Sequence, residues 1–399
     1  MEGQIRHRIQ HTPKEEITRR IENLRPLLKK ASLDGAFFHY KIDFFYLSGT
    51  MQDAFLFVPT DGTPKLFVKR DLRRARRESP LDEVLPIGSF SEIEPYARGM
   101  KRVGFQLDVV PYSFVLKFKE YLDPDVELID VSPLTKALRK YKSPFEISII
   151  EKAAAIAKKV YEAVPHLLKE GMREIELGGI MESMAKSMGH EGLLRVRSMN
   201  YEAYTWHILS GRTGSIVSQS DSPMGGLGLS PAFPVGASMK KMKRGEPILV
   251  DFGICYHGYQ IDQTRMFAIG SMPDEFARAY HVCRDIHYRV LDKALTGAKS
   301  NELFAYSVEL AKEAGYGDYF LGYDNHKVRF LAHGIGLELA EPPFIAQNHD
   351  YPIEQGTVFA IEPKMVFPRK GACGVENTIF MEKGGYRVLT TMDENIIVV

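Results

Sequence analysis

The feature that most constrains this chain is an apolar strand that ends in a carboxylate and then turns back on itself. The run 247–253 is apolar apart from Asp251 and its end residues, and a second acidic residue, Asp262, follows eleven positions later. Two short runs around a glycine-containing turn predict a β-hairpin. With the turn centred between Tyr256 and His257, Asp251 and Asp262 would lie opposite each other, their Cβ atoms about 4.5 to 5.5 Å apart. Like charges at that distance repel, so we expect a cation between them.

A second ribbon of the same kind lies near the C-terminus. The runs 358–363 and 374–378 flank a turn predicted at 368–371. Glu362 and Glu376 can again lie opposite each other across this hairpin. The sequence therefore predicts two ribbons that each carry a pair of carboxylates.

A histidine stands between the two ribbons, in the run Ala-His-Gly-Ile-Gly that contains His333. Its neighbours Gly334 and Gly336 allow the backbone to approach a ligand closely. Four carboxylates and a neutral imidazole carry four negative charges, which two divalent cations would balance and one would not. Oxygen-rich ligation favours manganese, cobalt, iron or zinc over a thiolate zinc site. We therefore predict a site for two divalent ions whose ligands are Asp251, Asp262, His333, Glu362 and Glu376.

Each of these residues also has an ordinary structural explanation when it is taken alone. An acidic residue at a strand end is commonly a solvated turn residue, and a histidine before glycine is more often a core or surface residue than a ligand. The run 251–253 imitates a kinase motif, but the other kinase motifs are missing from the sequence. The glycines of 225–228 lack the Lys-Ser/Thr of a phosphate-binding loop, which favours a flexible loop.

The length and the pattern of the chain indicate two domains. A chain of 399 residues that is 44% apolar exceeds the usual size of a single core. Ser143 followed by Pro144 is a helix-start signal, and it opens a helix predicted to run to about Lys169. Before this point, short helical and strand patterns alternate; after it, the pattern alternates again between helices and apolar strands. The helices are predicted at 21–31, 113–122, 174–188, 274–295 and 301–314, and the strands of the first half at 35–39, 54–58, 65–68, 102–106 and 126–131.

The composition of the chain limits the classes of binding partner that we expect. Fifty-two basic and fifty-one acidic residues give a net charge of +1, which favours neither nucleic acid nor an anionic membrane. The arginine-rich run 69–77 has no interleaved aromatic residues and is expected to be a solvated face. No apolar run is long enough to span a membrane. Three scattered cysteines favour a reducing compartment, so a cytoplasmic protein that acts on a small molecule or pairs with a second copy is expected.

The order and the spacing of the acidic residues and the histidine carry a family resemblance. Asp251, Asp262, His333 before Gly-Ile-Gly, Glu362 in Ile-Glu-Pro, and Glu376 resemble the prolidase and aminopeptidase P family of metallopeptidases. The resemblance implies an α/β (α+β) fold with a creatinase-type N-terminal domain over 1–141 and a pita-bread catalytic domain over 142–399. It implies that the five residues are metal ligands and that Glu362 also accepts a proton. It further implies that a metal-bridging hydroxide cleaves short peptides with proline in second place, and that the chain forms a homodimer.

Three positions depart from the pattern of that family. Its peptidases usually have a second histidine where this chain has Ala340, another histidine near Pro234, and an arginine where Gly374 stands. Such groups hydrogen-bond the substrate, and the loss of one donor commonly lowers the rate by about 10²-fold or more. His207, in the apolar strand 206–209, is the replacement we predict to be catalytic, although a histidine hydrogen-bonded inside a sheet is the competing interpretation. His326 and Glu341 lie near His333 in the sequence and are further candidates.

Three functions therefore compete on sequence grounds. The first is a metallopeptidase for proline-containing dipeptides or short peptides. The second is a metal-dependent enzyme of a different reaction type on the same fold, such as a C–N hydrolase or a lyase. The third is an inactive, peptidase-like binding protein, which the preserved spacing of five ligands makes the least favoured.

Overall fold

A computed structural model describes residues 10–198, 206–219 and 222–399 of the chain. It divides into two compact units, a first that ends at Arg139 and a second that begins at Lys140. None of the described helices is both long and apolar enough to cross a membrane.

The first unit is built on one six-stranded mixed sheet, in the order β4-β3-β2-β1-β5-β6. Strand β1 pairs antiparallel with β2 and parallel with β5. The elements of this unit are α1 (Lys14–Lys30), β1 (Gly35–Phe38), α2 (Lys41–Ser48), β2 (Ala54–Pro59), β3 (Lys65–Val68), α3 (Leu72–Glu78), β4 (Glu83–Pro86), α4 (Glu94–Ala97), β5 (Arg102–Phe105), α5 (Tyr112–Lys119), β6 (Glu127–Asp130) and α6 (Ser132–Arg139).

Aromatic side chains fill the space between this sheet and α5. The Phe118 ring stacks on Phe105 with centroids 4.6 Å apart and meets Phe37 edge-on at 5.2 Å. Helix α1 begins at Lys14, earlier than predicted, because buried Arg20 pairs with Glu16 at 2.9 Å and so extends the packed face with polar residues. The arginine-rich helix α3 is largely exposed, and Arg74 pairs there with Glu78 at 2.6 Å.

The second unit begins with the long helix predicted from its start signal. Helix α7 (Pro144–Leu167) starts at Pro144; the Ser143 hydroxyl accepts from the Glu146 backbone N–H at 3.2 Å, and the Glu146 carboxylate accepts from the Ser143 N–H at 2.9 Å. The other elements are α8 (Glu174–Ser187), β7 (Trp206–Ser210), β8 (Ile248–Phe252), β9 (Ile254–Tyr256), β10 (Tyr259–Ile261), β11 (Thr264–Ala268), α9 (Asp274–Ala294), α10 (Ser300–Glu313), β12 (Phe330–Gly334), β13 (Glu341–Ala346), β14 (Val358–Ile361), β15 (Lys364–Phe367), β16 (Gly371–Gly374), β17 (Asn377–Glu382), β18 (Gly385–Val388) and β19 (Ile397–Val398).

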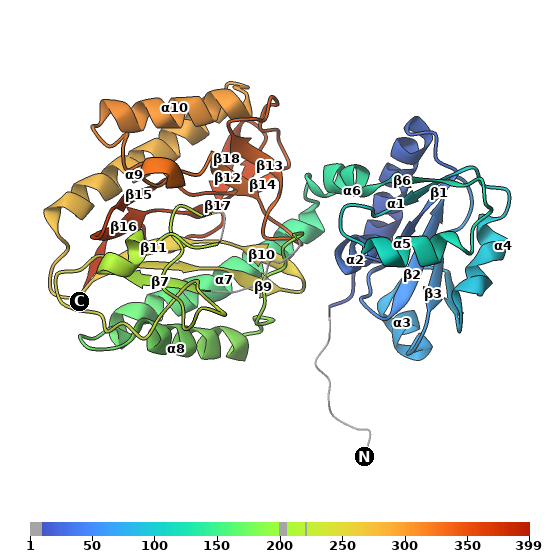
Figure 1. Ribbon diagram of the computed structural model, residues 1–399, viewed down its shortest axis with the longest axis horizontal. Coiled ribbons are helices and arrows are strands. Elements are labelled where there is room, and N and C mark those ends of the chain that lie inside the picture. Colours follow the sequence, from blue (N-terminus) through green and yellow to red (C-terminus); the bar gives the residue numbers. More distant parts are fainter. Residues whose placement is uncertain (1–9, 199–205, 220–221) are drawn as a thin grey trace, which may run out of the picture. The chain divides into compact units, whose positions relative to one another are not determined.

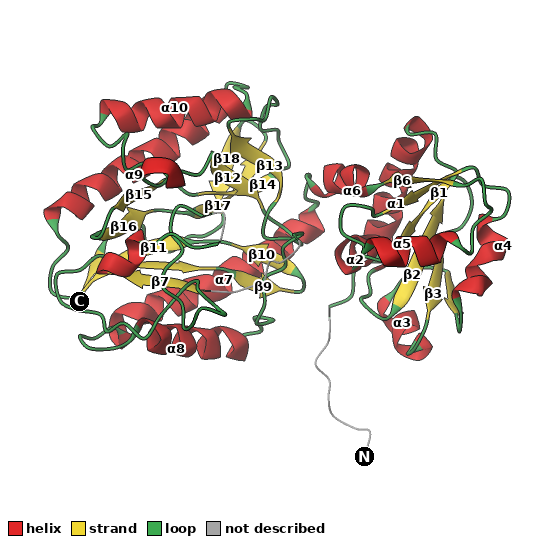
Figure 2. Ribbon diagram, in the orientation of Figure 1, coloured by secondary structure: helices red, strands yellow, loops and turns green. Residues whose placement is uncertain are grey.

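The strands of the second unit lie between two helical layers. Helices α7 and α8 cover one side and α9 and α10 the other (Figure 1). Between them lie a four-stranded sheet, β19-β11-β8-β7, a five-stranded sheet, β13-β12-β14-β17-β18, and two short ribbons, β9–β10 and β15–β16. Figure 2 shows these strands collected in the middle of the unit. The two carboxylate-bearing ribbons predicted from the sequence therefore both belong to this central layer.

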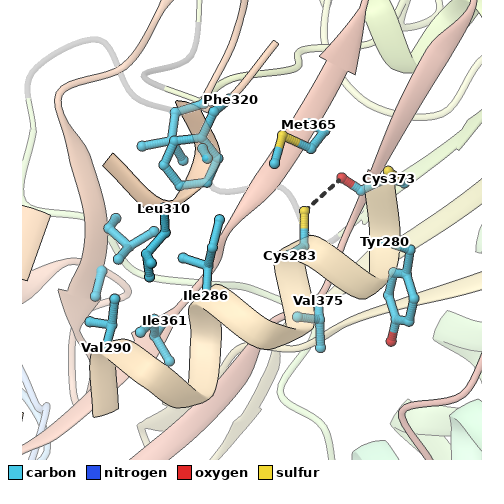
Figure 3. Close-up of a cluster of buried hydrophobic side chains, with 14 of the residues drawn as sticks. Tyr280, Cys283, Ile286, Val290, Leu310, Phe320, Ile361, Met365, Cys373 and Val375 are labelled. Carbon is cyan, nitrogen blue, oxygen red and sulfur yellow. Dashed lines mark hydrogen bonds between the residues drawn. The ribbon is translucent and has the colours of Figure 1, made fainter. Parts of the chain in front are cut away.

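A hydrophobic core of this unit lies beneath the second ribbon. Cys283, Ile286 and Val290 of α9 pack in one buried cluster with Ile361, Met365 and Val375 (Figure 3). All three cysteines of the chain are buried and free. The core thus holds the apolar residues that stand next to Glu362 and Glu376 in the sequence, which fixes where the two carboxylates point.

Candidate metal centre

The first ribbon differs in register from the prediction. Asp251 of β8 pairs with Thr264 of β11, not with Asp262, so the prediction that the two aspartates lie directly opposite each other was wrong. The turn is made by His257 and Gly258, with φ of 48° and 81°. Two-residue hairpin turns favour positive φ at both central positions, and glycine adopts it readily, so the turn includes Gly258. The register moves by two residues, which keeps the side chains on their predicted face.

The second ribbon has the predicted register. Ile361 pairs with Asn377 and Lys364 with Gly374, so the intervening Glu362 and Glu376 lie across from each other. Side chains alternate between the two faces of a strand. Because the neighbouring apolar residues enter the core beneath α9, the two glutamates point to the other face, toward the first ribbon.

His333 of β12 joins these carboxylates from a neighbouring strand. It pairs with Ala360 of β14, and its Nε2 lies 3.6 Å from Glu362 Oε1 and 3.9 Å from Glu376 Oε1. These separations are too long for hydrogen bonds. They suit atoms that share one ion, because two donors each about 2.1 Å from a metal lie at most about 4.2 Å apart.

The structure adds a residue that sequence reasoning missed. Lys364 is buried, and its Nζ donates to Asp251 Oδ2 at 2.8 Å, Glu362 Oε2 at 2.8 Å and Glu376 Oε2 at 2.9 Å. A signal was present in the sequence, because Lys364 stands two residues after Glu362 and so belongs to the same face of the strand. The charge count made from the sequence left this cation out.

Burial and mutual repulsion shift the acidities of this cluster. Burial, followed by the charges of Glu376 and Asp251, raises the pKa of Asp262 well above its usual range. Burial, with the charges of Glu362 and Asp251, raises the pKa of Glu376 to about 8, although Lys364 opposes that rise. Burial would also raise the pKa of Asp251, but the Lys364 ammonium holds it below its usual value. Both carboxylates with raised pKa values, Asp262 and Glu376, contribute a ligand atom to the group around His333.

The donors beside His333 fit a divalent ion. One ligand atom from each of Asp262, His333 and Glu376 lies within 4.8 Å of the others, and Glu362 Oε1 faces the same imidazole. Glu376 is almost wholly buried, and among the described residues no hydrogen-bond donor lies against its Oε1. A buried carboxylate oxygen without a donor is costly unless a cation or water satisfies it. Three carboxylates and one imidazole are suitable ligands for manganese, iron, cobalt or zinc.

Neighbouring side chains hold the ligands in place. The Thr264 hydroxyl donates to Glu376 Oε2 at 2.8 Å. The buried guanidinium of Arg265 donates to the backbone carbonyls of Thr264 and Glu376 at 2.9 and 2.8 Å. Arg265 also donates to carbonyls of Thr390 and Met392, at 3.2 and 2.9 Å. It therefore ties both ligand-bearing ribbons to the C-terminal segment.

The replacement candidates differ in where they lie. His207 of β7 pairs in register with Asp251 and is buried; burial lowers its pKa, while the charge of Asp251 opposes that shift. Glu341 is buried in an ion pair with Lys142, with Nζ and Oε1 2.7 Å apart, and His326 is exposed. Of the three candidates, His207 is the one beside the cluster.

The glycines next to His333 are explained by packing. A Cβ atom at Gly334 would lie 2.2 Å from the carbonyl oxygen of Glu341, and one at Gly336 would lie 2.4 Å from the carboxylate of Glu341. These glycines therefore admit strand β13 and the Lys142–Glu341 pair. The prediction that they leave room for a ligand has no support in these contacts.

Two facing carboxylate ribbons between paired helical layers define a metalloenzyme of the pita-bread class. Residues 148–383 match the model of metallopeptidase family M24, and residues 20–141 match the creatinase/prolidase N-terminal domain. The first match covers more than half of the chain. The chain belongs to metallopeptidase family M24, which confirms the resemblance drawn from the motif.

Individual relatives agree with this assignment. The chain is 29% identical to the Xaa-Pro dipeptidase of Pyrococcus furiosus over 381 residues, covering 95% of this chain and 99% of that protein. The crystal structure of the prolidase from Pyrococcus horikoshii OT3 matches with a TM-score of 0.80 at 26% identity, over 95% of this chain and 100% of that one. The prolidase from Pyrococcus furiosus matches with a TM-score of 0.75 at 28% identity, over 92% and 99% of the two chains.

Proposed function

We propose that the chain is a metal-dependent hydrolase that cleaves short peptides with proline in the second position. The observation that carries the proposal is the convergence of Asp262, His333, Glu362 and Glu376 on one buried point, with an oxygen of Glu376 that no donor among the described residues satisfies. The Xaa-Pro dipeptidase relative, aligned along nearly its whole length, supports the choice of substrate.

The residues of the centre suit the hydrolysis of an amide bond. A divalent ion bound there would lower the pKa of a water molecule and polarise a carbonyl group. Glu362 is held through Oε2 by Lys364, and its Oε1 points toward His333. We assign Glu362 the role of proton acceptor, through the oxygen that Lys364 leaves available. Asp251 lies on the Lys364 side of the cluster, where it holds the ammonium.

Three finer parts of the proposal concern the identity of the metal, the cellular compartment and the oligomeric state. The oxygen-rich donor set favours manganese, cobalt, iron or zinc. The three free and buried cysteines suit a reducing compartment, for which we propose the cytoplasm. We also propose a homodimer, by similarity to the family. Metal analysis of protein purified from cells would test the metal, and fractionation of those cells would test the compartment. Light scattering on the purified chain would test the oligomeric state, and a monomeric mass would refute the dimer.

Hydrolysis of Xaa-Pro dipeptides tests the proposed function directly. Metal-free protein reloaded with Mn²⁺ or Co²⁺ is expected to release free proline from Xaa-Pro dipeptides and to leave matched dipeptides without proline intact. Free amino acids measured by chromatography give the result. If metal-loaded protein hydrolyses no Xaa-Pro peptide, the peptidase proposal fails. The second function, a different metal-dependent reaction on this fold, would then be favoured by Ala340 and Gly374, which replace expected substrate-binding groups.

His207 is proposed to contact the substrate and to stabilise the charge that develops on its carbonyl oxygen. Its position opposite Asp251 supports this role. His207→Gln is expected to lower kcat by about 10²-fold, the usual effect of removing one such donor, with KM and the ion content almost unchanged. His326→Gln, at an exposed histidine, is the control. An unchanged kcat, or a loss of bound metal in parallel with activity, would contradict a direct role in the reaction.

A further inference from the structure

We infer that the centre binds one divalent ion per chain, and that the ammonium group of Lys364 takes the place of a second ion. The residues of this chain fit one divalent cation beside His333, but they do not fit a pair. Lys364 on β15 excludes the second ion. Its hydrogen bonds, the position of its stem and its positive charge each support this inference.

Lys364 uses the oxygens that a second ion would need. Its Nζ lies 2.8 Å from Asp251 Oδ2 and Glu362 Oε2 and 2.9 Å from Glu376 Oε2. An ammonium group has three N–H donors, and these three carboxylates accept all of them. A divalent ion bound to the same oxygens would have to lie in the space that Nζ fills. The ammonium and a second metal therefore exclude each other.

The two glutamates are divided between two cations. Each turns its Oε2 to Lys364 and its Oε1 toward His333, at 3.6 Å for Glu362 and 3.9 Å for Glu376. Carboxylates that bridge two metal ions have this arrangement, with one oxygen on each ion. Here one of the two bridged positions has the imidazole and Asp262 as further donors, and the other already contains the ammonium.

Gly374 provides the room for the lysine stem. It pairs with Lys364 across the ribbon, and a Cβ atom at Gly374 would lie 2.6 Å from Lys364 Cγ and 2.7 Å from the backbone oxygen of Pro363. Real Cβ atoms do not approach other atoms so closely, so a side chain at this position would displace the lysine. The glycine that departs from the family pattern therefore lies directly against the stem of the lysine that fills the centre, and it leaves that stem its space.

The charges of the centre agree with a single ion. Four carboxylates carry four negative charges, Lys364 contributes one positive charge, and one divalent ion contributes two. The remaining single negative charge can be met by a proton or by a polar contact. With the ammonium in place, a second divalent ion would instead reverse the sign of the remaining charge.

Counting bound ions tests the inference. Protein freed of metal and then dialysed against Mn²⁺ is expected to retain one ion per chain by elemental analysis. Lys364→Ala removes the ammonium and opens the space, so it is expected to retain two. Lys364→Met is the matched control: it also removes the charge but keeps an apolar stem in the space, and it is expected to retain one. Two ions in the unchanged protein, none in it, or one in Lys364→Ala would each overturn the inference.

Electron paramagnetic resonance can count the bound Mn²⁺ ions in the unchanged protein, so this test does not depend on the folding of a variant. One Mn²⁺ per chain gives the resolved signal of an isolated ion, whereas two ions about 3.5 to 4 Å apart give a coupled spectrum. The isolated signal is expected for the unchanged protein, and the coupled spectrum would refute the inference. The inference deepens the proposed function and rests on its metal, but ion counting involves no substrate. A protein that binds one ion and cleaves no Xaa-Pro peptide would refute only the peptidase proposal.

Discussion

An Asp262→Asn variant is expected to lose its divalent ion and at least about 10³-fold of its hydrolytic rate. Asp262 belongs to the donor group that converges beside His333. A bound metal contributes several kcal/mol to transition-state stabilisation, and each 1.36 kcal/mol corresponds to about tenfold in rate. Elemental analysis and the initial rate of proline release would measure the two losses.

The same variant is expected to fold at least as well as the unchanged protein when no metal is present. Burial and the charges of Glu376 and Asp251 disfavour the ionised Asp262 carboxylate, as its raised pKa shows. Asparagine removes that repulsion and keeps an oxygen for the Gln263 N–H, which donates to Asp262 Oδ1 at 3.0 Å. In the unchanged protein, an ion at a hundred times its Kd should add about 2.7 kcal/mol to the free energy of unfolding. In Asp262→Asn it should add nothing.

Asp285→Asn, at an exposed position on α9, is the matched control for this pair of measurements. It should bind the ion, hydrolyse the substrate and respond to metal as the unchanged protein does. If Asp262→Asn kept both its metal and its activity, Asp262 would not be a ligand. If Asp262→Asn unfolded without metal, the proposal that charge repulsion at Asp262 destabilises the metal-free fold would be wrong.

Arg265→Met is expected to lower the free energy of unfolding by about 3 to 5 kcal/mol, because several buried carbonyl oxygens lose their donor at once. Arg265 is fully buried and donates to the carbonyls of Thr264, Glu376, Thr390 and Met392. Methionine fills part of the volume but satisfies none of these acceptors, and each buried acceptor left without a donor costs about 1 to 3 kcal/mol. Urea denaturation of the metal-free protein would measure the loss.

Metal affinity should fall in Arg265→Met as well, because Thr264 and Glu376 would no longer be held at their carbonyls. Titration calorimetry under conditions where the variant is folded would measure this change. Arg289→Met on α9, where the arginine is half exposed and pairs with Asp285 at 3.4 Å, is the control and should change the unfolding free energy by less than about 1 kcal/mol. Equal stability of the Arg265 and Arg289 variants would contradict the anchoring role of Arg265.

The sequence was sufficient to place most of the centre because local rules determine those parts. Glu362 and Glu376 face each other as predicted, since one turn and a period of two fix the register between them. The start of α7 at Pro144 follows from a capping box that is readable in four residues. Turn chemistry also explains the error at Asp251, because the predicted turn was centred one residue too early, between Tyr256 and His257 and not between His257 and Gly258.

Other parts of the centre depended on contacts that no local pattern contains. The spacing of Lys364 from Glu362 places it on the same face of the strand, but its contact with Asp251, more than a hundred residues away in sequence, follows only from the fold. Arg265 stands three residues after Asp262 in the sequence, but its role as an anchor follows from partners near the C-terminus that are more than a hundred residues away. His207 was identified from its strand, but its neighbour Asp251 followed from the order of strands in the sheet.

A cation that is part of the polypeptide cannot be removed by a chelator. The three hydrogen bonds of Lys364 keep Asp251, Glu362 and Glu376 gathered at one point whether or not metal is available. Protein that loses its ion during metal starvation would therefore keep Glu362 and Glu376, two of its four donors, in position, and reloading should require little rearrangement of the second ribbon. Lys364 would thus hold the two glutamates in a binding-competent position while the divalent ion dissociates and binds again.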